Sequence, residues 1–325
     1  VFAPALRPTP PRRGKQITQR TTWALLALLL IVIALGVTIS LVNLNAADDS
    51  IGGPEATATI ESAVVAALTA IAPTPSPLPR PTTLPTPTPQ PFITETGSRM
   101  LYVPPVTFPM GDDEGERDER PLRLVQMDAF FMDETEVTVG QYTQCVDAGA
   151  CRVPRVSSEN YYGNAAFNDY PVIFVNWYDA QTFCEWRGAR LPSEAEWEMA
   201  ASFDPVEAAK YRFPWGDSFD GNKLNFCDVN CTHSSRDTNY DDGYRFAAPV
   251  GTYPDGRSPI GAYDMAGNVV EWLGDWYGFS YYREGNDVNP RGPTEGEFKS
   301  IRGGSWLSAA GEVATVARSS LDPLV

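Results

Sequence analysis

The chain has 325 residues, 43% of them hydrophobic, and a formal net charge of −16. Six of its 25 basic residues and four of its 41 acidic residues lie within 1–92, which leaves 93–325 with a net charge near −18. Such a charge argues against binding of nucleic acid or anionic lipid headgroups by this part of the chain. Solubility, cation binding or a basic partner remain as explanations.

An uncharged run of twenty residues extends from Trp23 to Val42. As a helix it would span roughly 30 Å, the hydrocarbon thickness of a bilayer. Five basic residues precede it, whereas Asp48 and Asp49 follow it. By the positive-inside rule we expect 1–21 to be cytoplasmic, 22–44 to be one transmembrane helix, and the rest to be periplasmic or extracellular. The alternative is a cleaved signal peptide, but the apolar core of such a peptide is only about 7–15 residues long.

Residues 45–98 are predicted to be a linker rich in Ala, Pro and Thr. Nine prolines occur within 73–91. Such a segment cannot bury a core and favours polyproline II, which extends by about 3.1 Å per residue. We therefore interpret it as a spacer that precedes a folded domain at 99–325.

Three helices are predicted from their capping residues. Thr138 with Gln141 forms the pattern of a capping box and predicts a helix over 139–147. Asn176 precedes a predicted helix over 177–187, which Gly188 ends. A second capping-box pattern, Ser193 with its Glu three residues later, predicts a helix over 194–201.

Elsewhere the domain consists of short apolar segments between turn residues. None exceeds strand length, and Asp-Gly turn signals recur. This pattern predicts an α+β domain with long irregular loops, in which tryptophans supply much of the packing. The four clearest segments are 101–103, 130–132, 247–250 and 300–302.

The five cysteines are typical of an oxidising compartment. Cys145 and Cys151 lie six residues apart, and Cys227 and Cys231 lie four apart. We predict one disulfide within each pair, which leaves Cys184 reduced and buried. The alternative is a metal site, but these spacings and a single histidine in the chain fit zinc poorly.

The predicted domain resembles the formylglycine-generating enzyme (sulfatase-modifying factor) family. The order and spacing of several motifs carry this resemblance, whereas any one motif alone would be weak. The resemblance implies the family's C-type-lectin-like α+β fold, with little regular secondary structure. The motifs are 110–111 (MG), 130–138 (FFMDETEVT), 171–177 (PVIFVNW), 190–198 (RLPSEAEWE), 213–216 (FPWG), 261–272 (GAYDMAGNVVEW) and 302–306 (RGGSW).

The oxidases of this family carry a reactive cysteine pair just after the Gly-Gly-Ser motif. The matching positions here are Ser308 and Val313. Because two soft thiolates bind copper(I), we expect no copper here, and no catalytic residue. The family's iron-dependent sulfoxide synthases need several histidines, and this chain has only His233, so we expect no iron either.

Two other candidate sites have more ordinary interpretations. Glu194, Glu196 and Glu198 resemble carboxylates for acid–base catalysis, but they follow a helix cap, where acidic side chains are favoured by the helix dipole. Three tryptophans could stack on a sugar, but they occupy positions that the family uses for its core. Sugar binding is kept as a minor alternative; the residues are Trp272, Trp276 and Trp306.

The resemblance further implies two structural calcium sites. Hard oxygen donors from carboxylates, amides and backbone carbonyls are the ligands that calcium prefers. One site would use the side chains of Asn225 and Asp242 with the carbonyls of Phe226 and Tyr244. The other would use the side chains of Asp264 and Glu271 with the carbonyls of Gly267 and Val269.

These observations favour a pseudoenzyme over an enzyme. We expect a membrane-anchored accessory subunit that uses a degenerate domain to bind the other subunits of a larger bacterial membrane complex. A respiratory or photosynthetic electron-transfer complex is the example we consider. The rival hypothesis is an extracytoplasmic, oxidase-like enzyme that modifies proteins.

Overall fold

The computed structural model describes residues 90–155, 161–234 and 236–325. The predicted transmembrane helix and most of the predicted linker lie outside these residues. Among the described residues, no helix is both long and apolar enough to cross a bilayer. The folded part begins earlier than the predicted boundary at residue 99, because a short strand at Phe92–Ile93 already pairs with the domain.

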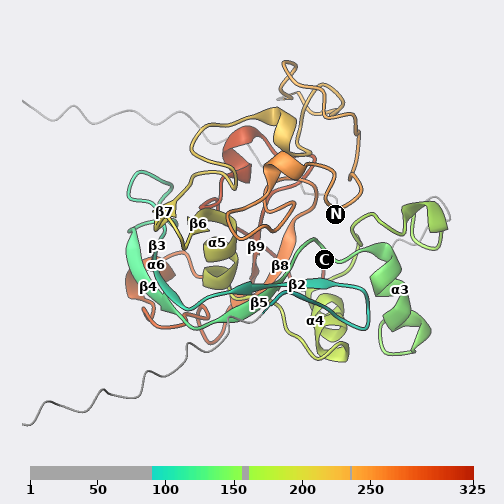
Figure 1. Ribbon diagram of the computed structural model, residues 1–325, viewed down its shortest axis with the longest axis horizontal. Helices are drawn as coiled ribbons and strands as arrows, with labels where there is room; N and C mark the ends of the chain where they lie inside the picture. Colours follow the sequence, from blue (N-terminus) through green and yellow to red (C-terminus); the bar gives the residue numbers. More distant parts are fainter. Residues whose placement is uncertain (1–89, 156–160, 235) are drawn as a thin grey trace, which may run out of the picture. The chain divides into compact units, whose positions relative to one another are not determined.

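Four small antiparallel sheets form the frame of the domain (Figure 1). Their strands are two to six residues long, so regular structure is sparse, as the sequence predicts. The first sheet has the order β1-β2-β5, the second β10-β9-β8, and the other two are the pairs β3-β4 and β6-β7. The strands are β1 Phe92–Ile93, β2 Arg99–Val103, β3 Val106–Met110, β4 Arg123–Met127, β5 Phe130–Asp133, β6 Phe203–Asp204, β7 Ala209–Lys210, β8 Glu271–Trp276, β9 Lys299–Arg302 and β10 Ser319–Leu321.

The three predicted helices are present with their predicted caps. They are α3 Val139–Asp147, α4 Trp177–Trp186 and α5 Glu194–Ser202. Each begins with a complete capping box, including one at Asn176 whose reciprocal partner is Asp179. A one-turn helix, α6, follows at Tyr281–Glu284, and 3-10 turns occur at Ala165–Phe167, Gly221–Lys223, Pro254–Gly256 and Ala310–Val313.

The main core surrounds α5, which contacts β3, β8 and β9. All nine residues of this helix are buried, including its three glutamates. Trp197 and Met199 are fully enclosed and pack with Phe108 and Leu273 from the sheets. A helix buried on every side positions whatever its side chains touch very precisely, because close-packed interiors resist small displacements.

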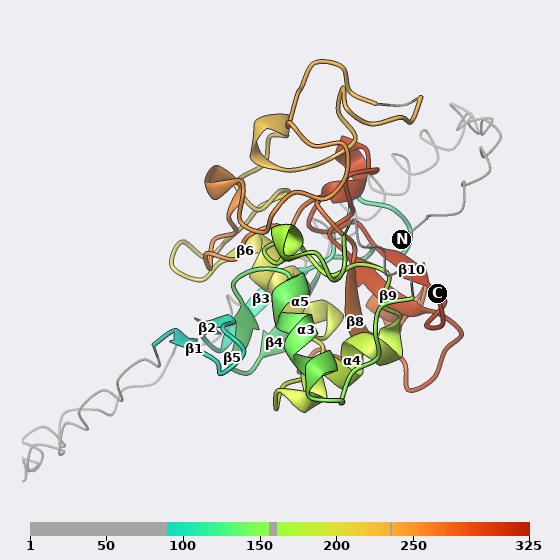
Figure 2. The same ribbon diagram turned by 90° about the vertical axis from the view of Figure 1, so that its right-hand side faces the viewer.

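Long loops connect β7 to β8 and gather at the end of the domain opposite α4 (Figures 1 and 2). The expected strand over 247–250 is not formed, because this segment belongs to these loops. Ala247 and Ala248 are nevertheless buried, and Ala247 packs in a small cluster with Val269 and Trp306. Burial in an irregular loop therefore produced the same apolar pattern as a strand.

Candidate functional site

The loop after β9 occupies the position at which the family resemblance places the catalytic cysteines. It begins with Gly303 and Gly304, whose φ angles of 88° and 73° lie in the left-handed region that favours glycine. The loop is held against the segment before β8, because Gly267 N donates to Gly303 O and Trp306 N donates to Asn268 O. The sharp turn brings later residues of the loop back onto the glycines.

Ser308 and Val313 lie close together beside Gly304. A Cβ atom on Gly304 would lie 3.1 Å from Ser308 Oγ and 2.8 Å from a Val313 methyl group. Ser308 Oγ accepts a hydrogen bond from Ser305 N, so the hydroxyl already has a structural partner. The fold therefore keeps the two positions adjacent, while their side chains offer a neutral hydroxyl and a hydrocarbon where a thiolate pair would be needed.

Val313 is fully buried in an apolar cluster. Its neighbours include Phe213, Leu224 and Phe226, so hydrophobic packing accounts for its burial. The loop is also tied to the second disulfide, because Cys227 N donates to Ser308 O over 3.0 Å. What remains at this position is hydrophobic packing.

The structure contains the two expected disulfides, Cys145–Cys151 and Cys227–Cys231. Cys184 is free and buried on α4. Burial raises the pKa of its thiol to about 11, so the reactive thiolate form is scarce at neutral pH. His233 lies in an exposed loop, away from any cluster of possible metal ligands among the described residues.

The predicted first calcium site is brought together in part. The Asp242 carboxylate accepts hydrogen bonds from Phe226 N at 3.1 Å and from Tyr244 N at 2.8 Å, so three of the four predicted residues are in contact. The fourth, Asn225, is 1% exposed, and its Oδ1 has no hydrogen-bond partner within the described part of the chain. A buried carbonyl oxygen without a donor is unfavourable, and a cation would satisfy it.

The predicted second calcium site has a buried carboxyl residue, Asp264, and a partly buried one, Glu271. Glu271 accepts a hydrogen bond from Trp197 Nε1, and Asp264 accepts one from Gly251 N. Burial raises the pKa of Glu271 to about 8, and the nearby charge of Asp264 adds to the shift. The Val269 carbonyl oxygen and Glu271 Oε1 both lie 3.8 Å from the position of a Cβ on Gly303. The donor set thus fits a hard cation, although no group of three His, Cys, Asp or Glu side chains converges among the described residues.

A buried ionic network explains the three glutamates of α5 better than catalysis does. Arg302 donates to Glu194 over 2.9 Å and to Glu198 over 2.8 Å, and Arg318 binds both oxygens of Glu194. Burial alone would raise the pKa of Glu198, but the charges of Lys210 and Arg302 outweigh it and lower the value to about 2. Carboxylates held ionised in this way are poor general acids and bases near pH 7.

The remaining glutamate, Glu196, closes the capping box with Ser193 and pairs with Arg190. Of the three tryptophans considered for sugar binding, Trp306 is buried in the small loop cluster. The centre of the Trp276 ring lies 3.9 Å from Lys299 Nζ. Trp272 donates from its indole to Val175 O. All three therefore have contacts within the domain.

Comparisons with known proteins place these features in context. The family described as "Sulfatase-modifying factor enzyme 1-like domain" matches residues 85–324. The chain is 30% identical to the formylglycine-generating enzyme of Streptomyces coelicolor, over 66% of this chain and 82% of that protein. It is 31% identical to hercynine oxygenase of Mycolicibacterium smegmatis, over 60% of this chain and 50% of that protein.

A further relative is the serine/threonine-protein kinase pkn1 of Chlamydia pneumoniae, which is 33% identical over 72% of this chain. The chain spans only about a third of that kinase, 36% of its length. Among solved structures, PvdO from Pseudomonas aeruginosa superimposes with a TM-score of 0.57 at 25% identity, covering 74% of this chain and 94% of PvdO. Treponema denticola variable protein 1 shares the fold at 21% identity, with a TM-score of 0.56 and coverage of 73% and 95%.

Proposed function

Since the chain belongs to the sulfatase-modifying factor enzyme 1-like domain family, we propose that this member is a non-catalytic binding module. It would serve as a membrane-anchored accessory subunit of a larger bacterial membrane complex. One observation carries the proposal. Ser308 and Val313 lie side by side next to Gly304, at the positions of the family's catalytic cysteines, and neither residue has a thiol. A scaffold that is kept while its reactive groups are replaced is better suited to binding than to turnover.

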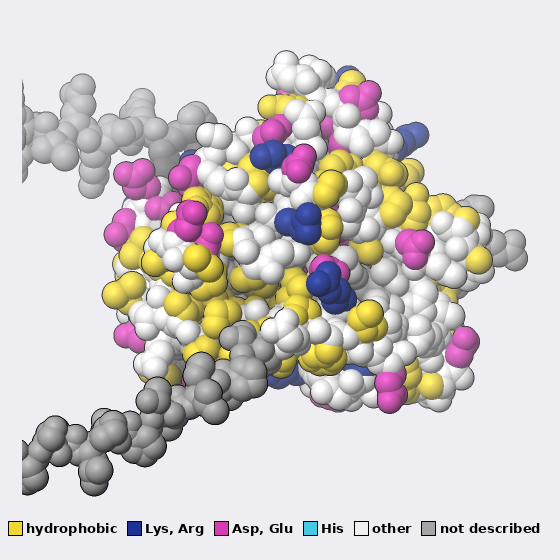
Figure 3. Space-filling view, viewed as in Figure 1, with side chains coloured by type: hydrophobic (Ala, Val, Ile, Leu, Met, Phe, Trp, Pro, Cys, Tyr) yellow, Lys and Arg dark blue, Asp and Glu magenta, His cyan; other side chains and the backbone are white. Residues whose placement is uncertain are grey.

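The surface is compatible with binding to another protein. Hydrophobic side chains are spread over the face shown in Figure 3, with acidic side chains mainly along its edges. Among the described residues, several large hydrophobic side chains are well exposed, for example Ile93 at 71%, Leu124 at 63% and Phe246 at 62%. Exposed apolar area rimmed by polar groups is a common property of interaction surfaces.

The uncharged run from Trp23 to Val42 supports the membrane anchor. In the proposed topology the N-terminus is cytoplasmic and the acidic domain lies outside the cell membrane. Protease added to intact right-side-out vesicles should then remove the domain and spare the N-terminus. Protection of the domain together with loss of the N-terminus would contradict this topology.

Purification of the full chain in a mild detergent tests the accessory role. We expect it to co-purify in constant stoichiometry with other membrane proteins, whose identities would name the complex; respiratory and photosynthetic assemblies are the first to examine. The outcome that would contradict the proposal is a monomer that oxidises a cysteine-containing peptide. The similarity to the formylglycine-generating enzyme of Streptomyces coelicolor makes an oxidase-like, protein-modifying activity the second candidate.

A further inference from the structure

A cavity of about 520 Å³ lies between the β1-β2-β5 sheet, α4 and the start of β8. It is separate from the loop that carries Ser308 and Val313, neither of which lines it. Its volume falls within the range of about 300–1,000 Å³ that small-molecule sites occupy. Most of its wall is apolar, and the principal side chains are Met100, Met132, Val175, Phe183 and Trp272.

One polar group in this wall lacks a partner. Arg187 lies at the end of α4 with its side chain 5% exposed, and its guanidinium pairs with both carboxylate oxygens of Asp133. Its Nε, however, is buried and makes no hydrogen bond to any residue that the structure describes. The Cys184 thiol lies beside it and interacts with the guanidinium through a side-chain hydrogen bond as well as through charge, but sulfur is only a weak acceptor. A buried N–H without an acceptor is unfavourable, so an acceptor brought by a ligand would be stabilised there.

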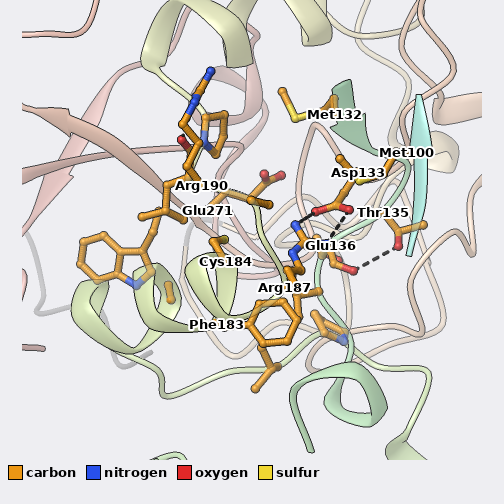
Figure 4. A pocket seen from close by; sticks show the side chains of 18 of the residues that line it. Met100, Met132, Asp133, Thr135, Glu136, Phe183, Cys184, Arg187, Arg190 and Glu271 are labelled. Carbon is orange, nitrogen blue, oxygen red and sulfur yellow. Dashed lines mark hydrogen bonds and ion pairs between the residues drawn. The ribbon is translucent and has the colours of Figure 1, made fainter. Parts of the chain in front are cut away.

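The arrangement of these groups is visible in Figure 4. The Arg187 side chain lies between the ring of Phe183 and the Asp133 carboxylate, with Cys184 and Glu271 on its other side. The guanidinium carbon is 5.3 Å from the centre of the Phe183 ring. These contacts fix the direction of the Nε–H bond before any ligand arrives, and such preorganisation lowers the entropic cost of binding.

The charges in the wall favour an uncharged ligand. Arg187 is paired with Asp133, and Arg190 is paired with Glu196, so neither cation is free to bind an anion. The remaining carboxyl groups already accept hydrogen bonds from the protein, Glu136 from Val269 N and Glu271 from Trp197 Nε1. Apart from a cation at the candidate calcium site, which shares Val269 and Glu271 with this wall, an ionic ligand would therefore lose its hydration without gaining an unpaired partner.

We propose that this cavity binds a neutral, largely apolar small molecule through one hydrogen-bond acceptor, such as a carbonyl oxygen, directed at Arg187 Nε. This inference does not depend on the accessory role proposed above. The cavity is a feature of this chain's fold whether the chain acts as an enzyme or as a binding module.

The test uses the full chain in lipid nanodiscs and a neutral ketone fluorophore, 6-propionyl-2-(dimethylamino)naphthalene. Trp272 lines the cavity, so energy transfer from tryptophan reports bound probe. Nanodiscs that carry Trp272→Phe give the background from the other tryptophans, including Trp23 of the predicted membrane helix. We expect saturable binding to one site. Ala180→Leu fills the cavity from α4 and should weaken binding at least tenfold, whereas Thr182→Leu, on the exposed side of the same helix, should leave it unchanged.

A second comparison tests the polar contact. Arg187→Lys keeps the charge that faces Asp133 but removes Nε, and it should weaken binding of the ketone probe by about 3- to 10-fold. The matched propyl compound lacks the carbonyl, so its affinity, measured by displacement of the probe, should be the same for Arg187→Lys and the parent protein. Arg99→Lys, which alters only a surface ion pair, serves as the control. Absence of saturable binding, equal binding by the two leucine variants, or an equal effect of Arg187→Lys on both ligands would overturn the proposal.

Discussion

Two arginines far along the chain determine how the carboxylates of α5 are used. Arg302 and Arg318 lie 104 to 124 residues from the glutamates that they bind. The sequence shows three acidic residues after a helix cap, and the dipole interpretation holds for Glu196, which closes the capping box. The roles of Glu194 and Glu198 depend on tertiary pairing, which no local pattern reveals. Removing one partner of such a buried group would be strongly destabilising, because a charge would remain uncompensated.

Asp275, on β8, is a residue that the sequence did not single out. It is 3% exposed, and its Oδ2 accepts a hydrogen bond from Glu194 N. Burial, and then the charge of Glu194, raise its pKa to about 7. A carboxyl group whose pKa is raised on folding favours the protonated native state, so its contribution to stability is lost as the pH rises from about 4 to 7.

Asp275→Asn should therefore stabilise the domain more at pH 8 than at pH 5. The amide keeps an acceptor for Glu194 N and cannot ionise. At 1.36 kcal/mol per pKa unit, the gain at pH 8 relative to the parent is on the order of 2–4 kcal/mol. Urea unfolding of both proteins at each pH measures this difference, and Asp255→Asn, at an exposed position, provides the control. A gain in stability that is the same at both pH values would show that the pKa of Asp275 is not raised in the folded protein.

At the scale of elements, the helices could be predicted from the sequence and most of the rest could not. Helix starts depend on local pairs, such as Thr138 with Gln141, and the bounds of α3 agree with the prediction. Strands of two to six residues carry little periodic information. The segment 247–250 shows the limit, because tertiary burial in a loop made it resemble a strand. The pairing of β1 with β2 was missed because Phe92 follows a proline-rich run.

Ser193→Ala tests how much the cap of α5 contributes. Ser193 Oγ accepts a hydrogen bond from Glu196 N at 3.2 Å, and the site is 2% exposed, so water cannot easily replace the hydroxyl. We expect a loss of about 1–2 kcal/mol in the free energy of unfolding, measured by urea denaturation. Thr182→Ala, which removes an exposed hydroxyl on α4, should cost much less. Equal losses would mean that the cap contributes no more than a surface hydroxyl.

At the scale of the whole molecule, long loops must be held together by a few cross-links. The loop end of the domain depends on the Cys227–Cys231 disulfide, on loop hydrogen bonds and on buried acidic groups. The family resemblance supplied the candidate calcium ligands, since carboxylates separated by long loops have no recognisable spacing. The unpartnered Asn225 Oδ1 became visible only in the folded arrangement.

We propose that bound calcium stabilises this end of the domain. A cation that binds only the folded protein stabilises it, and raises its melting temperature, with the logarithm of the ratio of free cation to Kd. Excess chelator should therefore lower the melting temperature, and Glu271→Gln should remove most of this dependence. Glu297→Gln, at an exposed position, should behave like the parent protein. An unchanged melting curve in protein verified as metal-free would exclude a stabilising calcium ion.

We propose that this domain keeps the family scaffold without its copper chemistry. Copper(I) loading, followed by gel filtration and metal analysis with a mild reductant that spares disulfides, tests it most directly. The double variant Ser308→Cys/Val313→Cys is the matched control, because both side chains lie beside Gly304 and two thiolates there would suit a soft metal. We predict no stoichiometric copper in the parent protein and retention of about one ion by the variant. Stoichiometric copper held by the parent domain would contradict the account.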